Sequence, residues 1–312
     1  MKCFVTGGAG FIGSHLVDRL LNEKHEVTVF DDMSSGKEEF IAHHFNNPNF
    51  NFIKEDLINK TQVEKEIKDH DVVFHIAANP DVRSGADNPS IAEKDIQATY
   101  NLLDAMRMQN IKKIVFSSSS VIYGETPAIP LPENYGPLLP ISVYGAAKLA
   151  SEGLISSFAH TFNMQAWIYR FANVVGIRGT HGVIVDFINK LRKNPNELEI
   201  LGDGKQRKPY LYVTECVDGI MHGFNHSDQE INVFNLGVNS ITDVTRIGEL
   251  VKKELGLENA TFSYTGGKRG WKGDVPHFQF DINKIKNLGW QPKLSSDDAV
   301  RKAIQDLLKS GL

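Results

Sequence analysis

The feature that most constrains the fold lies at the start of the chain, where a short apolar run, Cys3–Thr6, leads directly into Gly7, Gly10 and Gly13. The amphipathic segment Phe11–Asn22 begins directly after Gly10 and contains Gly13. Glycines between a strand and a helix allow a tight turn and a close approach of backbone to ligand, and a helix N-terminus attracts a pyrophosphate. The glycine loop therefore predicts a nucleotide-binding strand–loop–helix unit.

The first half of the chain alternates short β-branched runs with longer amphipathic segments. The expected strands are Cys3–Thr6, Glu26–Phe30, Asn51–Lys54, Asp71–Ile76, Lys113–Ser117 and Ala166–Arg170. The expected helices are Phe11–Asn22, Thr61–Lys68, Ser90–Gln109 and Tyr144–Phe162. Apolar strands that alternate with helices indicate a parallel sheet buried on both faces. We predict an α/β fold with a Rossmann-type doubly wound parallel sheet.

After Asn173 the pattern loosens, with glycine and proline through 176–182, 201–209 and 266–276. Helices are expected at Val183–Lys193, Asp243–Glu254 and Ser296–Lys309, and strands at Tyr210–Val213 and Val233–Leu236. We predict that residues 1–172 form the nucleotide-binding domain, which also receives strands from about 209–240. Residues 173–312 are expected to form mainly a smaller substrate-binding lobe.

Composition excludes several classes of protein. The net charge of −4 does not suit a nucleic-acid or membrane-surface binder. Both cysteines, Cys3 and Cys216, lie in apolar runs and are expected to be buried thiols. The first strand begins too close to Met1 for a signal peptide, and no apolar stretch reaches the length of a membrane span. We expect a soluble cytoplasmic protein.

Acidic residues follow the second and third predicted strands. Asp31 lies 18 residues after Gly13, where a carboxylate accepts both ribose hydroxyls and repels a 2′-phosphate, so the pattern favours NAD over NADP. Asp56 ends the next strand, where it can contact the adenine. His75 has no partner cluster of Cys, Asp or Glu in the sequence, so it is interpreted as a buried strand-end histidine, and no metal site is expected.

Tyr144 and Lys148 are four residues apart and share one face of a predicted helix. There a lysine ammonium can stabilise a tyrosine phenolate, which makes tyrosine a base near neutral pH. Ser117–Ser120 end the fifth predicted strand, at the edge where doubly wound sheets bind ligands. Together with the glycine loop, these residues indicate hydride transfer at a hydroxyl group.

These motifs make the chain resemble the extended short-chain dehydrogenase/reductases, and within them the NAD-dependent sugar-nucleotide epimerase/dehydratase family, UDP-glucose 4-epimerase-like. The resemblance rests on TGGAGFIG, Asp31, HIAA, SSSSVIYG, YGAAK, the segment Arg170–Gly176 and Gly202-Asp-Gly204. It implies Tyr144 as the catalytic base, Lys148 as its partner and Ser119 as the residue that holds the reacting hydroxyl. It also implies NAD-binding residues, namely Gly7, Gly10, Phe11, Ile12, Gly13, Asp31, Asp32, Ser35, Asp56, Leu57, Ile76, Ala77, Ala78, Asp95, Ser117, Tyr144, Lys148 and Phe171. The substrate-binding residues that it implies are Ser119, Asn173, Val183, Leu201, Arg207, Lys208 and Arg269.

The chain departs from the family pattern in ways that bear on the reaction. The 4,6-dehydratases have an Asp-Glu pair where this chain has Ser120 and Val121, so elimination of water is disfavoured. Lys208 stands where the family has an arginine for the diphosphate, and Trp271 replaces another arginine, with Arg269 nearby. The resemblance therefore implies oxidation at C4 of a nucleotide-diphosphate sugar, followed by net epimerisation. Two alternatives stay open: a 4-dehydrogenase of the GDP-heptose type that releases the keto sugar, and a non-catalytic NAD-binding regulator. A homodimer built on two long helices is expected from the family.

Overall fold

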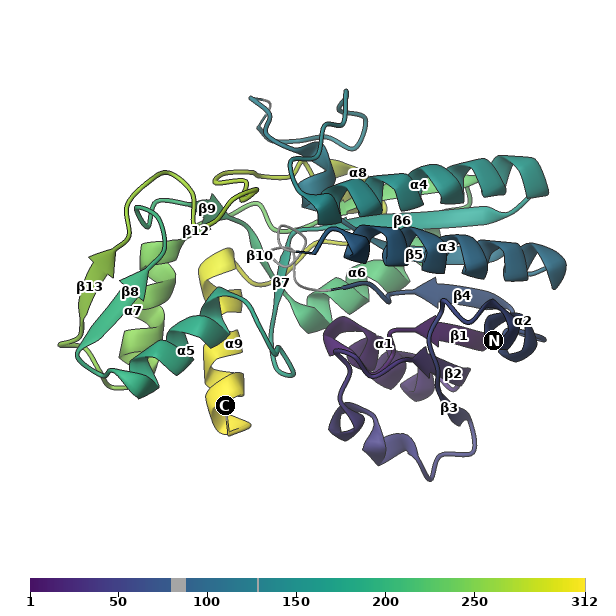
Figure 1. Ribbon diagram of the computed structural model, residues 1–312, viewed down its shortest axis with the longest axis horizontal. Helices are drawn as coiled ribbons and strands as arrows, with labels where there is room; N and C mark the ends of the chain where they lie inside the picture. The colour runs from purple at the N-terminus through teal and green to yellow at the C-terminus, as the bar shows by residue number, and fades with distance from the viewer. Residues whose placement is uncertain (80–87, 128, 312) are drawn as a thin grey trace. The chain divides into compact units, whose positions relative to one another are not determined.

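The computed structural model of the protein describes residues 1–79, 88–127 and 129–311 (Figure 1). Within these residues, seven strands form one sheet in the order β11-β6-β5-β4-β1-β2-β3. Their bounds are β1 Lys2–Thr6, β2 Glu26–Asp31, β3 Phe50–Lys54, β4 Val72–His75, β5 Lys113–Ser119, β6 Gln165–Phe171 and β11 Ile231–Leu236. β1 pairs in parallel with β2 and β4, β2 with β3, and β4 with β5. The doubly wound α/β fold predicted from the sequence is thus confirmed.

The strand order places a topological switch point between β1 and β4. The chain moves outward from β1 to β3, returns to the other side of β1 as β4, and continues outward to β6. Ligands of doubly wound sheets bind outside the carboxyl ends of the strands at such a point. The glycine loop after β1 and the segment after β4 both lie there.

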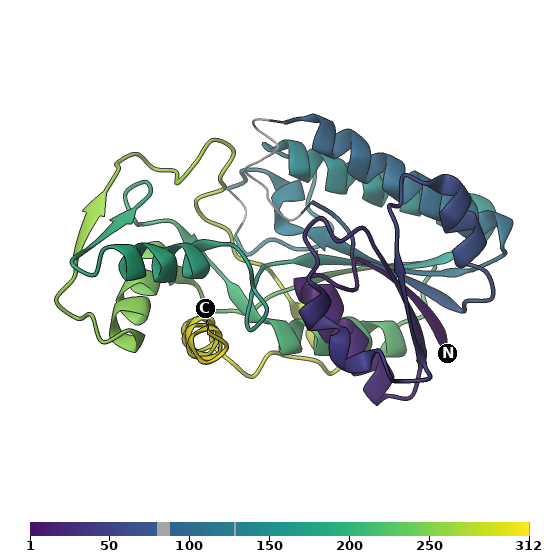
Figure 2. The same cartoon turned by 60° about the horizontal axis from the view of Figure 1, so that its bottom comes forward.

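Helices cover both faces of this sheet. They are α1 Phe11–Asn22, α2 Lys60–Glu66, α3 Ser90–Met108 and α4 Val143–Phe162, with short 3-10 helices η1 Glu38–Phe40, η2 Ala42–His44 and η4 Ser120–Tyr123. Figures 1 and 2 show α3 and α4 side by side on one face and α1 on the other. Strand side chains such as Phe4, Val73 and Ile114 are completely or almost completely buried in this core.

The second half of the chain contains smaller elements. They are β7 Asn173–Val175, α5 Val183–Lys193, β8 Glu197–Ile200, β9 Arg207–Lys208, β10 Tyr210–Tyr212, α6 Val213–His226, β12 Thr242–Asp243, α7 Val244–Glu254, β13 Thr261–Tyr264, α8 Asn283–Asn287 and α9 Ser296–Lys309. Three two-stranded sheets pair β10 with β7, β12 with β9, and β13 with β8. Of the two segments expected to return to the main sheet, β11 does so, whereas β10 pairs with β7.

Two helices, the short α8 and the longer α6, were not predicted, and α6 shows how a helix can be missed. Its sequence contains Gly219 and Gly223, and glycine disfavours a helix interior because it loses the most backbone freedom. The structure requires both glycines: a Cβ on Gly223 would lie 2.6 Å from the Tyr169 hydroxyl, and one on Gly219 would lie 2.8 Å from Leu236. The two glycines that make α6 hard to recognise in the sequence are therefore the residues that allow it to pack closely against Tyr169 and Leu236.

Two compact units emerge from the contacts. The first comprises Met1–Ile122, Ser142–Arg170 and Ile220–Phe234, and the second comprises Tyr123–Ile141, Phe171–Gly219 and Asn235–Leu312. Cys3 and Cys216 are free and buried, as predicted. None of the helices in the described part of the chain combines the length and apolar composition that a membrane crossing requires.

Candidate active site

The glycine loop is a cradle that side chains would fill. Gly7 has a φ of +69°, and a Cβ there would lie 2.7 Å from the Ala77 backbone. A Cβ on Gly13 would lie 2.0 Å from the carbonyl oxygen of Gly7. α1 begins after Gly10, a residue without a side chain to cap its first turn. Backbone N–H groups at such a helix start bind anions, so the loop fits the pyrophosphate of a dinucleotide.

Asp31 lies at the end of β2 beside this loop. The residue is 7% exposed, and its carboxylate accepts hydrogen bonds from the backbone N–H groups of Ala9 and Met33, both at 2.9 Å. Burial raises the pKa of Asp31, and the two backbone hydrogen bonds oppose that rise. The carboxylate is therefore fixed at the carboxyl edge of the sheet, where it can receive the two hydroxyls of a ribose.

Lys94, which the sequence analysis does not identify as a site residue, forms ion pairs with two of the predicted cofactor residues. Lys94 of α3 lies 3.2 Å from a carboxylate oxygen of Asp32 and 2.9 Å from one of Asp56. These contacts tie the start of α3 to the ends of β2 and β3. Ser35 lies exposed in the bend after β2, and Leu57 is buried directly after Asp56.

The segment after β4 meets the glycine loop. Ile76, Ala77 and Ala78 are partly buried there, and the backbone of Ile76 and Ala77 packs directly against Gly7. His75 is buried, and its ring nitrogens lie 2.8 Å from the Thr6 hydroxyl and 3.1 Å from the Thr99 hydroxyl. Burial lowers the pKa of His75 to about 3, with a smaller contribution from Lys148. The interpretation of His75 as a buried strand-end histidine is confirmed.

Ser119, Tyr144 and Lys148 lie together, although β5 and α4 supply them from separate parts of the chain. The Ser119 side chain is hydrogen-bonded to the Tyr144 hydroxyl. The Lys148 Nζ lies 5.8 Å from the centre of the Tyr144 ring and donates a hydrogen bond of 2.6 Å to the Ser117 carbonyl oxygen. Ser142 caps α4 by accepting from the Gly145 N–H at 3.1 Å, which starts the helix just before the tyrosine.

Burial and neighbouring charges shift the pKa values of Tyr144 and Lys148. Burial raises the pKa of Tyr144, the Asp95 carboxylate raises it further, and the hydrogen bond with Ser119 lowers it. Burial lowers the pKa of Lys148 to about 8, while Asp95 and Glu152 act to raise it. A group with a pKa near 8 is mostly protonated at neutral pH, so Lys148 is a buried cation next to the phenol.

Behind Lys148, a buried network connects β5, α4 and β6. Glu152 lies one helical turn after Lys148, and its carboxylate accepts hydrogen bonds from the Ser118 hydroxyl at 2.5 Å and from Arg170 at 3.1 and 2.8 Å. The Arg170 and Glu152 side chains are 7% and 8% exposed. Sequence reasoning did not identify Glu152, although its i,i+4 spacing from Lys148 was the available signal.

Apart from Ser119, which lies in the first unit, the predicted substrate residues fall in the second unit. Lys208 Nζ lies 2.5 Å from a carboxylate oxygen of the buried Asp274, and Arg269 donates to the Asp274 backbone oxygen at 2.7 Å. Arg269 also forms an ion pair with Glu125 at 2.7 Å. The structure thus brings Lys208 and Arg269 together around Asp274.

The other predicted residues of the second unit lie on separate elements. Asn173 begins β7, Val183 begins α5, Leu201 follows β8, and Arg207 is exposed in β9. Asn173 is hydrogen-bonded to Tyr210. Phe171, predicted to contact the cofactor, ends β6 and is buried.

Comparison with known proteins identifies the family. The sequence profile described as "NAD dependent epimerase/dehydratase family" matches residues 3–237. A crystal structure of UDP-galactose 4-epimerase is 40% identical over the full length of both chains, with a TM-score of 0.90. The UDP-glucose 4-epimerase of Thermotoga maritima, solved with UDP-glucose, is 32% identical over 99% of both chains, with a TM-score of 0.89. The UDP-glucose 4-epimerase of Mycolicibacterium smegmatis is 30% identical over 98% of both chains. With its glycine loop, Asp31 and clustered Ser119, Tyr144 and Lys148, this chain belongs to the NAD-dependent epimerase/dehydratase family of enzymes.

Proposed function

We propose that this protein is a cytoplasmic nucleotide-sugar 4-epimerase that uses NAD and acts on a UDP-linked hexose. The observation that carries the proposal is the grouping of Ser119 and Tyr144 with the buried Lys148, whose Nζ lies 5.8 Å from the centre of the Tyr144 ring. This cluster lies in the same compact unit as the glycine loop. The UDP-sugar 4-epimerases described above support UDP as the nucleotide.

The residues that hold NAD in this proposal surround the switch point. The Gly7–Gly13 loop and the start of α1 bind the pyrophosphate, and Asp31 binds the adenosine ribose. Asp56 and Leu57 lie beside the adenine, and Ile76, Ala77 and Ala78 leave space for the cofactor backbone. The remaining predicted contacts are Asp32, Ser35, Asp95, Ser117 and Phe171.

The proposed chemistry assigns one task to each member of the cluster. When bound, NAD supplies the hydride acceptor and donor for C4 of the sugar. Tyr144 removes the proton of the 4-hydroxyl, Ser119 holds that oxygen, and Lys148 stabilises the phenolate. The 4-keto sugar then turns its other face to the cofactor, and Tyr144 returns the proton. The net result is inversion at C4.

Dehydration is not expected. Loss of water from C5 and C6 needs an acid and a base, and the 3-10 helix η4 supplies neither, since it reads Ser120-Val-Ile-Tyr123. The next carboxylate along the chain, Glu125, is paired with Arg269.

The test uses the purified enzyme with UDP-glucose, UDP-galactose, UDP-N-acetylglucosamine and UDP-glucuronate, each followed by proton NMR. We expect the C4 epimer to form while absorbance at the NADH band stays constant. Tyr144→Phe should lower the rate at least ~10²-fold, the scale for an acid–base group, and should still bind NAD. Stoichiometric NADH with a released keto sugar would favour the dehydrogenase. Carbon dioxide from UDP-glucuronate would indicate decarboxylation of the β-keto acid that C4 oxidation creates there, and a 6-deoxy product would indicate a dehydratase.

In this proposal the NAD-binding domain is residues 1–172 together with β11, and the rest of 173–312 is mainly the substrate-binding lobe. The proposed substrate contacts are Asn173, Val183, Leu201, Arg207, Lys208 and Arg269, with Ser119 at the sugar. The cationic pair around Asp274 supports a diphosphate contact, because ammonium and guanidinium groups bind phosphate oxygens. Lys208→Ala should therefore raise KM for the UDP-sugar more than it lowers kcat.

We also propose a homodimer formed through α3 and α4. Their outer faces expose or half-expose apolar side chains, including Tyr100, Met108 and Phe158. Two such helices and their twofold mates form a four-helix bundle. Light scattering should give about twice the chain mass of 34.8 kDa, whereas a monomer mass at micromolar concentration would contradict the proposal.

A further inference from the structure

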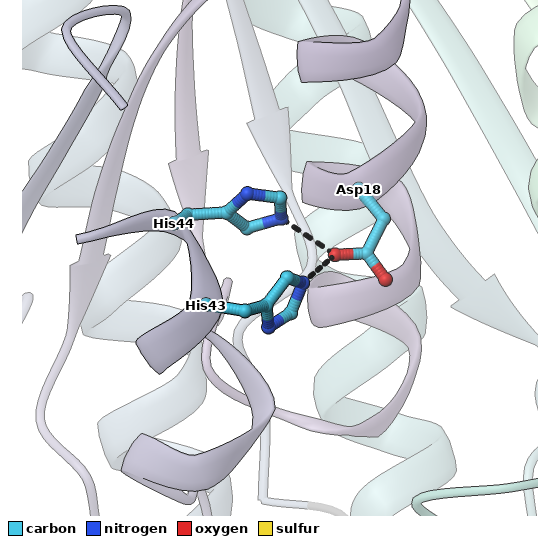
Figure 3. A group of neighbouring side chains, drawn as sticks. All are labelled: Asp18, His43 and His44. Atoms are coloured by element: carbon cyan, nitrogen blue, oxygen red, sulfur yellow. Dashed lines mark hydrogen bonds and ion pairs between the residues drawn. The ribbon is translucent and has the colours of Figure 1, made fainter. Parts of the chain in front are cut away.

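A cluster of three side chains lies in the first unit, apart from the residues assigned to catalysis. Asp18 of α1 faces His43 and His44 of η2, and Figure 3 shows both imidazoles directed at the same carboxylate oxygen. The His43 Nε2 lies 2.9 Å from the Asp18 Oδ1, and the His44 Nε2 lies 2.7 Å from it. One donor atom from each residue lies within 4.8 Å of the others.

We propose that Asp18, His43 and His44 form a binding site for a zinc ion or a similar divalent transition metal. Imidazole nitrogens suit Zn²⁺, Cu²⁺ and Ni²⁺, whereas Mg²⁺ and Ca²⁺ prefer oxygen ligands throughout. Three protein ligands leave a fourth tetrahedral position for water. Sequence spacing did not reveal the cluster, because the fold alone brings position 18 to positions 43 and 44.

The spacing of the three side chains suits zinc after a small adjustment. Metal–ligand bonds of about 2.0–2.2 Å in a tetrahedron place neighbouring ligand atoms about 3.3 Å apart. The present contacts of 2.9 and 2.7 Å are somewhat shorter, as expected for hydrogen bonds between the same atoms. The Asp18 and His43 side chains are 25% and 48% exposed, so both can move outward by the required few tenths of an ångström, and a shift of the carboxylate lengthens both contacts.

The surroundings hold the site and keep it accessible. The His44 side chain is 13% exposed, and its ring contacts Phe50 of β3 with the centres 5.6 Å apart. The two imidazoles lie 3.9 Å apart between ring centres, so a single cation can reach both. Asp18 keeps 25% exposure, which leaves a path for an ion from solvent.

A bound ion would cross-link α1 to the segment that follows β2. These elements carry the glycine loop at one end and Asp31 at the other. Because a ligand that binds only the folded protein stabilises it by mass action, zinc should raise the melting temperature.

The direct test is isothermal titration calorimetry of the chelator-treated, full-length protein with Zn²⁺, supported by the visible spectrum of the Co²⁺ form. We expect one strong site with tetrahedral Co²⁺ absorption. Even the loss of a residue that only supports a ligand costs about 10–100-fold in metal affinity. Asp18, His43 and His44 are the proposed ligands themselves, so Asp18→Asn and the double variant His43→Gln/His44→Gln should each weaken binding at least about tenfold. The rise in melting temperature with zinc should disappear in the same variants.

The chain offers a matched control in a second histidine pair. His222 and His226 of α6 stack with ring centres 4.1 Å apart, and the structure shows no carboxylate that completes a three-ligand group with them among the described residues. The variant His222→Gln/His226→Gln should keep the strong site. Metal-free circular dichroism establishes that each variant is folded. Loss of the site in the α6 variant, its persistence in the α1 and η2 variants, or no binding by the wild type would each overturn the proposal.

Discussion

At the scale of single residues, Asp95 is the group that most affects the balance of charge around Tyr144. Its carboxylate accepts hydrogen bonds from the Asn79 N–H at 3.3 and 3.4 Å. It raises the pKa of Tyr144, after the larger effect of burial, and also acts to raise the pKa of Lys148. The Asp95 carboxylate therefore makes the Tyr144 phenolate harder to form and the Lys148 ammonium easier to keep.

Asp95→Asn should therefore move the pH–rate profile of the proposed reaction toward lower pH. Without the negative charge, the pKa of Tyr144 falls, so the phenolate forms at lower pH and the acidic limb of kcat/KM shifts down. The pKa of Lys148 falls as well, which shifts the basic limb in the same direction. The control is Asp228→Asn, an exposed site in the same unit, which should leave the profile unchanged. An unmoved profile for Asp95→Asn, or a shift to higher pH, would contradict this view of the site.

At the scale of elements, one face of α4 combines chemistry and structure. Tyr144, Lys148 and Glu152 recur at intervals of one helical turn, and each contacts or faces the end of β5. In the same way, the glycine loop joins the end of β1 to the start of α1.

Glu152→Ala should destabilise the protein substantially, because it leaves the Arg170 guanidinium buried without its carboxylate. Breaking one side of a buried ion pair costs about 3–5 kcal/mol. The exposed Arg246–Glu249 pair provides the comparison, with side chains 42% and 52% exposed. There Glu249→Ala should cost less than about 1 kcal/mol. Urea unfolding followed by circular dichroism measures both, and equal losses would show that the buried network contributes no more than a surface pair.

Gly13→Ala should damage the cofactor cradle. The added Cβ would lie 2.0 Å from the Gly7 carbonyl oxygen, and such overpacking costs about 1–3 kcal/mol or more. Fluorescence titration should show weaker NAD binding than in the wild type. Gly153→Ala is the control, because a Cβ there has no other atom within 4 Å, and alanine should stabilise α4 by about 0.5–1 kcal/mol. Unchanged NAD affinity in Gly13→Ala would rule out this loop as the pyrophosphate site.

At the scale of the whole molecule, local patterns predicted the fold well. The helices Phe11–Asn22, Val183–Lys193 and Ser296–Lys309 were expected with the bounds that the structure has, because apolar periodicity is encoded over a few turns. The glycine loop, Asp31 and the Tyr144–Lys148 pair were also evident, since each is defined by short spacing or by its position after a strand.

Contacts between distant segments could not be predicted in this way. Lys94 joins Asp32 to Asp56, Arg170 meets Glu152, and Asp18 meets the histidines of η2 only because the strand order brings their elements together. α6 was missed for a related reason, since its glycines are explained by Tyr169 and Leu236 on neighbouring strands. A single sequence indicates which side chains can react, but it does not indicate which distant side chains surround them.

In the proposed epimerisation, the hydride removed from C4 returns to the same carbon on the opposite face. The most direct measurement supplies UDP-galactose carrying deuterium at C4 and follows the product by proton and deuterium NMR. We expect UDP-glucose that keeps its deuterium at C4, with no accumulation of reduced cofactor. Product that carries a solvent proton at C4, or a labelled cofactor released together with a 4-keto sugar, would contradict it.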